Sequence, residues 1–167
     1  MRYRRPLGTN LDYETEWTSK TINRESLFNN LRDRDISSQR FKNVLSYTYE
    51  RVHRLSLDFL FMQDKESEER LVSARLITLK PVYEYKISGK GRVKVFTEFN
   101  QVAVTPKRTP IPWEMCNGKK EGLTFGWGSA LEYYIAQNLS LRLNYESWKE
   151  PQREIYHLGS GEMRIFF

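Results

Sequence analysis

Apolar and polar residues alternate with a period of two along most of this chain. The clearest stretch is 123–135, where Leu123, Phe125 and Trp127 begin a series of apolar residues separated by small or polar ones. A period of two sends successive side chains to opposite faces of an extended strand. The pattern therefore predicts two-faced, antiparallel β-strands at 11–19, 45–50, 55–61, 70–87, 93–100, 123–135, 139–146 and 155–167.

The connections between these strands alternate in length. Tight turns are predicted at 51–54, 88–91 and 137–138, and the other connections are longer or charged, with the longest loops at 21–39 and 106–121. Outer-membrane barrels have short periplasmic turns and longer loops outside. Counting back from the end of the last strand, every short turn falls at the same end as Phe167. This sorting favours an all-β, antiparallel up-and-down transmembrane β-barrel of about eight strands, or the last strands of a larger barrel.

Alternation alone leaves open which face is buried. A soluble β-barrel would turn the apolar stripe inward and bind an apolar ligand in its core, whereas a membrane barrel turns that stripe toward lipid. Repeated in eight strands, the bulky stripe of 123–135 would overfill an eight-stranded interior. The polar stripe is rich in Ser, Thr, Gly, Asn, Glu and Arg, and aromatic residues gather near strand ends, as in interfacial girdles. These features favour the membrane arrangement.

Composition agrees with one barrel domain at 11–167, preceded by a basic tail at 1–10. The chain has 167 residues and 14% aromatic residues. No apolar run approaches the roughly 18 residues that a membrane helix needs, and a mean hydropathy of −0.68 is compatible with strands that are polar on one face. The net charge is +6, but the basic residues are dispersed rather than gathered into a nucleic-acid face.

Strand 70–87 contains a change of phase. Val72, Ala74 and Leu76 share one parity, whereas Tyr83 and Tyr85 have the other. One extra residue would reconcile the two stripes, so we predict a β-bulge near Lys80–Pro81.

Four charged residues share the polar face of the last three strands: Glu132, Arg142, Glu162 and Arg164. Charges in a lumen are tolerable when they are paired. We therefore predict a paired charge network that plugs the lumen or lines a pore or binding site.

Other candidate chemistry is weak. His157 and Ser160 differ in parity, so they face opposite ways and cannot form a nucleophile–base pair. The single cysteine, Cys116, excludes an internal disulfide and is expected to be an ordinary thiol in the outer loop. Two distant histidines and one cysteine give no metal site. We expect no enzymatic activity and no cofactor, and no small-molecule ligand can be named.

The last strand ends with Met163, Ile165 and Phe167 on one face. Together with the stretches 112–118, 126–128, 141–145 and 157–167, this ending resembles the C-terminal ends of large outer-membrane proteins from the Bacteroidota and Chlorobi lineages. The resemblance implies a Gram-negative outer-membrane location, outer-membrane lipid as a partner, and recognition of these three residues by the barrel-assembly machinery. Two roles stay open. A closed eight-stranded barrel is too narrow to conduct solutes, so its role would be structural or would be binding through the loops at 21–39 and 106–121; alternatively, as the resemblance implies, the strands close a larger transport or secretion barrel. The glycine at Gly161 lies one residue earlier than in the commonest form of this signal.

The basic start of the chain is not followed by an apolar segment. A secretory signal peptide needs both, and an exported barrel is made with one. We therefore expect the sequence to be a mature or truncated piece of a longer protein.

Overall fold

The fold consists of nine β-strands in a single antiparallel sheet. A computed structural model describes residues 1–24, 34–66, 72–107 and 111–165. The elements are β1 (Arg2–Pro6), β2 (Leu11–Arg24), β3 (Arg34–Tyr49), β4 (His53–Glu66), β5 (Ser73–Ile87), β6 (Gly91–Thr105), the short 3-10 helix η2 (Met115–Gly118), β7 (Gly122–Ala136), β8 (Leu139–Lys149) and β9 (Ile155–Ile165).

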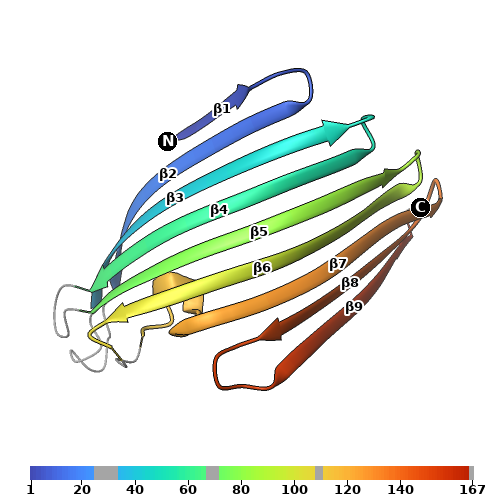
Figure 1. Ribbon diagram of the computed structural model, residues 1–167. Coiled ribbons are helices and arrows are strands. Elements are labelled where there is room, and N and C mark those ends of the chain that lie inside the picture. The colour runs from blue at the N-terminus through green and yellow to red at the C-terminus, as the bar shows by residue number, and fades with distance from the viewer. Residues whose placement is uncertain (25–33, 67–71, 108–110, 166–167) are drawn as a thin grey trace.

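Each strand pairs with its neighbours in sequence, from β1 through to β9. Figure 1 shows the result as a curved sheet that stays open between β1 and β9. Among the described residues, β1 pairs with β2 and β9 pairs with β8, so each of these strands keeps one free edge. The antiparallel up-and-down topology predicted from the alternation is confirmed, as an open sheet and not as a closed barrel.

The connections are sorted by length, as predicted. The short turns after β1, β3, β5 and β7 lie at one end of the sheet, together with the end of β9 (Figure 1). The longer connections after β2, β4, β6 and β8 lie at the opposite end. We call these the short-turn end and the long-loop end.

The strand count and several bounds differ from the prediction. A ninth strand, β1, occupies part of the predicted basic tail, where Arg2 and Arg4 pair across the ladder with Glu14 and Asp12 at 2.7 and 3.2 Å. The predicted loop at 21–39 is also shorter, because β2 continues to Arg24 and β3 begins at Arg34. The short helix considered at 25–33 lies outside the described residues.

The predicted β-bulge near Lys80–Pro81 is wrong. The β4–β5 register runs unbroken through Asp58–Lys80 and Leu57–Pro81, and the β5–β6 register is the same on both sides of this point. Ile77 and Leu79 continue the exposed stripe of Tyr83 without a change of phase. A register shift does occur at Tyr134–Ala136, between β7 and β8.

The apolar residues that suggested a bulge belong to a small core at the long-loop end. The segment after β6 folds back so that η2 contacts β4 and β5. Met115 and Cys116 of η2 are fully buried there. They pack with residues of β3, β4, β5 and β6 and with Val72: Ile36, Met62, Ala74, Leu76, Val102 and Val104.

Candidate functional site

The two faces of the sheet are chemically opposite. Even-numbered residues pair with even-numbered residues in the ladders, except for the Ala136–Leu139 pair beyond the register shift in β7–β8, so one parity defines one face along the strands. We call the even-numbered side, on which η2 packs, the inner face, and the odd-numbered side the outer face. On the described strands the outer face carries five charged side chains, Arg5, Asp35, Lys65, Arg75 and Lys149, whereas the inner face is charged along most of its length.

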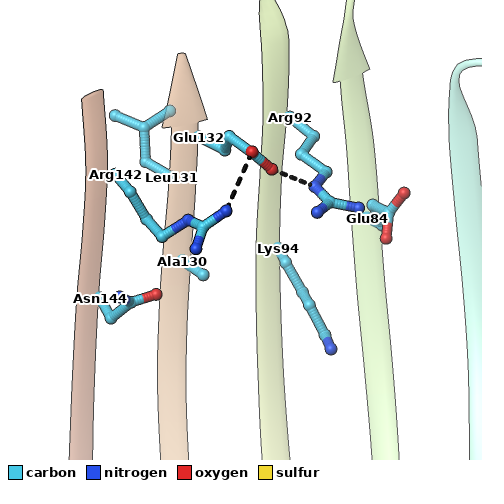
Figure 2. Close-up of a pocket in the computed structure, with 8 residues that line it drawn as sticks. All are labelled: Glu84, Arg92, Lys94, Ala130, Leu131, Glu132, Arg142 and Asn144. Carbon is cyan, nitrogen blue, oxygen red and sulfur yellow. Dashed lines mark hydrogen bonds and ion pairs between the residues drawn. The ribbon is translucent and has the colours of Figure 1, made fainter. Parts of the chain in front are cut away.

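A network of ion pairs lies on the inner face toward the short-turn end. Glu132 of β7 accepts from Arg92 of β6 at 2.8 Å and from Arg142 of β8 at 3.2 Å. Figure 2 shows Glu132 between these two arginines. Arg142 also lies 4.0 Å from Glu162 of β9, which accepts from Arg164 at 2.7 Å. The chain of charges thus links four consecutive strands.

This network borders a hollow of about 390 Å³ on the inner face. Its charged and polar lining comes from β5 to β8 and consists of Glu84, Arg92, Lys94, Glu132, Arg142 and Asn144. Cationic and anionic groups alternate around it. The hollow is therefore suited to water and small polar solutes and unsuited to an apolar ligand.

The structure brings the four predicted network residues together. Each of Glu132, Arg142, Glu162 and Arg164 contacts at least one of the others. Arg92 was not predicted to be part of the network. It lies on the same face as Lys94 and directly opposite Glu132 in the β6–β7 register. Whether the network also has a role beyond structure stays a prediction.

A second polar cluster surrounds Glu98 of β6, which is 8% exposed. Its carboxylate accepts from Lys80 of β5 and from Lys119 of the segment after β6, each at 2.9 Å. Asn100 donates to it at 3.0 Å and in turn accepts from Thr78 at 2.7 Å. One carboxylate is thus shared by two lysines, and one of those lysines anchors a segment outside the sheet.

The segment 111–121, which we call the inner segment, is fixed to the inner face at two points. The first is the Glu98–Lys119 pair. At the second, the backbone N–H of Cys116 donates to Oδ2 of Asp64 at 2.6 Å. Asp64 is 1% exposed, so this bond is shielded from water. The inner segment therefore covers the inner face at the long-loop end.

Cys116 is not the ordinary loop thiol expected from the sequence. Its side chain is fully buried in the core beneath the inner segment. Burial, with a smaller contribution from the Asp64 carboxylate, raises the pKa of the Cys116 thiol to about 12. Deprotonation and access both require the inner segment to open.

We expect Cys116 to react slowly with a maleimide at pH 7.5. The thiolate is the reactive form, and a raised pKa and burial both reduce its availability. Labelling followed by mass spectrometry, in folded and urea-unfolded protein, measures this protection. A folded-state rate equal to the unfolded rate would contradict the buried placement.

His157 and Ser160 lie on opposite faces of the sheet, as their parity predicts. His157 contacts Tyr145 on the outer face, with 2.7 Å between Nδ1 and the hydroxyl. Ser160 accepts from Asn144 on the inner face at 3.3 Å. In the described part of the chain, no three His, Cys, Asp or Glu side chains form a cluster suited to a metal ion. Among those same residues, no helix has the length and apolar character needed to cross a membrane.

The outer face is an exposed apolar surface. Trp17, Leu79, Phe99 and Trp127, from four different strands, are each between 40 and 51% exposed. Aromatic residues collect on this face at the short-turn end: Tyr47, Tyr49, Tyr83, Tyr85 and Tyr133. Exposed apolar surface this extensive marks an interaction surface. With a charged inner face, it defines the class of inside-out antiparallel β-sheets from which membrane barrels are built.

Comparison with known proteins supports this class at the level of the fold. The structure is similar to the outer-membrane expressed OmpT of Vibrio cholerae, with a TM-score of 0.65 and 9% sequence identity. The similarity covers 94% of this chain and 52% of that one, so the chain spans about half the length of that protein. No family model matches the sequence, and no curated protein matches it. The resemblance to Bacteroidota and Chlorobi proteins stays a prediction.

Proposed function

We propose that this chain is part of the wall of an outer-membrane β-barrel. Its outer face contacts lipid, and its inner face lines a water-filled interior that the inner segment narrows at the long-loop end. The segregation of charge between the two faces carries this proposal. Apolar side chains face outward and no described segment of the chain covers them, an arrangement that is costly in water and favourable in a bilayer.

The soluble alternative receives no support from the inner face. A barrel that binds an apolar ligand needs an apolar interior. Here the inner face carries the Glu132 network and the Glu98 cluster, and its apolar part is already filled by Met115 and Cys116.

We also propose that the complete barrel contains strands beyond these nine. The free edges of β1 and β9 would each expose unpaired N–H and C=O groups, and such groups are not tolerated against hydrocarbon. Additional strands that continue the sheet would satisfy them. Because the inner face is suited to water, we also propose a role in the passage or binding of polar solutes. We further propose that Met163, Ile165 and Phe167 form the assembly signal of the last strand. Met163 and Ile165 are 61 and 54% exposed on the outer face, and Phe167 lies outside the described residues.

Two single-tryptophan variants test the orientation of the sheet. One keeps Trp127 on the outer face and the other keeps Trp148 on the inner face, with the remaining tryptophans replaced by Phe. In vesicles of brominated phosphatidylcholine, bromine in the acyl chains should quench Trp127 strongly and Trp148 weakly. Equal quenching of both, or protein that stays monodisperse without detergent and shows no quenching, would overturn the proposal.

Leu79→Arg should destabilise the bilayer-inserted protein by about 2 to 4 kcal/mol, the cost of an arginine near the midplane on the lipid face of a barrel. Leu79 is 40% exposed on the outer face, midway along β5. The matched control is Val82→Arg on the same strand, because Val82 borders a polar inner hollow of about 270 Å³. Its charged lining is Glu14, Asp58 and Glu84 together with Lys42, Arg54 and Lys94. Urea unfolding in vesicles measures both, and an equal loss in the two variants would contradict the assigned faces.

A further inference from the structure

Two basic side chains break the apolar character of the outer face at the long-loop end. Lys65 lies near the end of β4, and Arg75 lies near the start of β5. Both are exposed, and neither makes an ion pair within the described part of the chain. Of the other charged outer-face residues at this end, Lys149 lies on β8. Asp35 of β3 is a diagonal neighbour of Lys65 across the β3–β4 register, and this carboxylate already has an interaction of its own.

Lys65 and Arg75 lie close enough to share one ligand. Arg75 is directly opposite Gln63, and Lys65 is directly opposite Ser73. The two basic residues are therefore diagonal neighbours, about 7 to 8 Å apart at the backbone. Their side chains are long enough to converge on a single tetrahedral anion, with the arginine forming two parallel bonds and the lysine acting as a point charge.

The depth of this pair matches a lipid headgroup. On the outer face of β5, the residues between Arg75 and Tyr85 are Ile77, Leu79, Pro81 and Tyr83. Ten residue steps span about 34 Å along a strand. A tilt of about 40° reduces this to about 26 Å along the membrane normal, which is close to the 25 Å apolar band of membrane barrels. With the tyrosines at one interface, Arg75 lies at the other.

The neighbouring residues also suit an interface. Gln39, Gln63 and Gln101 from three strands provide amide groups on the outer face around the two cations. The next outer-face residue toward the middle of the strand is Phe61 after Gln63 on β4 and Ile77 after Arg75 on β5, and Ile77 is 43% exposed. A ligand with a phosphate at the level of Lys65 and acyl chains at the level of Ile77 would contact both the polar residues around the two cations and the apolar residues toward the middle of the strands.

Building on the proposed function, we infer that Lys65 and Arg75 form a binding site for the phosphate of an anionic lipid in the leaflet at the long-loop end. The chemistry that fits is a phosphorylated headgroup with several acyl chains, as in a phosphorylated glycolipid. Outer-membrane barrels place their long loops outside, so this is the outer leaflet.

Titration of the full chain in detergent micelles with bis-phosphorylated lipid A, followed by native mass spectrometry, tests the site. Near a membrane surface each basic residue contributes about fivefold to binding of an anionic lipid. The Lys65→Gln/Arg75→Gln variant should therefore bind lipid A about 25-fold more weakly than the parent. The charge-retaining Lys65→Arg/Arg75→Lys variant should bind within about threefold of the parent, because both cations remain.

Two controls separate this site from general electrostatics. Arg51→Gln/Lys90→Gln removes the same charges from turns at the short-turn end and should leave lipid A binding unchanged. Dephosphorylated lipid A should bind the parent weakly.

The inference is overturned if the Lys65/Arg75 variant binds like the parent, if the turn variant loses as much affinity, or if inorganic phosphate alone competes fully with the lipid. If brominated lipid quenches Trp127 and lipid A binding is independent of the pair, this inference alone fails. Without that quenching, both proposals fail.

Discussion

Gly128→Val should destabilise the folded sheet by about 3 kcal/mol or more. Gly128 faces inward on β7, between β6 and β8. A Cβ atom there would lie 2.6 Å from Cζ of Phe96 and 2.8 Å from the backbone oxygen of Tyr145. The phenyl ring can rotate, but the Tyr145 carbonyl is held in the β7–β8 ladder, so the strands themselves must separate. Overpacking that forces side chains off their rotamers and shifts the backbone costs about 1 to 3 kcal/mol, occasionally more, and the backbone contact places Gly128→Val at the upper end of this range.

Gly159→Val is the matched control for this substitution. Gly159 lies on the outer face of β9, and a Cβ atom there has no neighbour within 4 Å. The same change should stay within about 0.5 kcal/mol of the parent, since it adds a β-branched residue to an open strand surface. Urea unfolding in vesicles, followed by tryptophan fluorescence, measures both variants. Similar stabilities for the two would show that the inner face near Gly128 is looser than the structure indicates.

Glu98→Gln should release the inner segment from the sheet. The substitution removes the negative charge that Lys80 and Lys119 share while preserving the shape of the side chain. Breaking a buried ion pair costs about 3 to 5 kcal/mol. The two lysine side chains here are 28 and 23% exposed, so we expect about 2 kcal/mol after allowing for solvent screening. Opening of the segment would then be favoured about 30-fold, and maleimide labelling of Cys116 would accelerate by a similar factor.

Glu132→Gln provides the comparison for Glu98→Gln. Glu132 also pairs with two cations, Arg92 and Arg142, but it lies in the network toward the short-turn end, and its described partners are all outside the inner segment. Its loss should leave the Cys116 labelling rate within about twofold of the parent, because segment opening involves none of its partners. If both variants accelerate labelling equally, general loosening of the sheet explains the result and the specific role of Glu98 is wrong.

The parity of the sequence was enough to predict the architecture and much of the charge network. The apolar stripe can be identified from the sequence of one strand alone, because successive side chains along a strand point to opposite faces. The shared parity of Glu132, Arg142 and Glu162 was therefore visible without any knowledge of register. Short turns fix the pairing of consecutive strands, and this converted shared parity into actual contacts.

The features that were missed depend on contacts between distant parts of the chain. Ala74 and Leu76 are apolar on the inner face because Met115 and Cys116 cover them, and no alternation within β5 can reveal a cover that begins some 40 residues later. The wrong bulge at Lys80–Pro81 followed from this. The Glu98 cluster was missed for the same reason, since Lys119 comes from outside the strands.

The strand β1 was missed for a different reason. It has five residues, three of them arginine, and ends at a proline, so its composition resembles a solvated tail. What holds it is complementary charge across the ladder, with Arg2 facing the acidic residue Glu14 of β2. A pairing of that kind becomes visible only when the partner strand is known.

The strand order has one further topological consequence. In an up-and-down sheet the chain reverses direction at every turn, so the first and ninth strands run the same way. If β1 and β9 were joined to each other, the seam would be parallel and unlike every other ladder in the sheet. A second copy inserted with the same orientation would meet the same mismatch, because its β1 also runs parallel to β9. An entirely antiparallel ring therefore requires an odd number of intervening strands, which makes the total even, as in single-chain bacterial barrels.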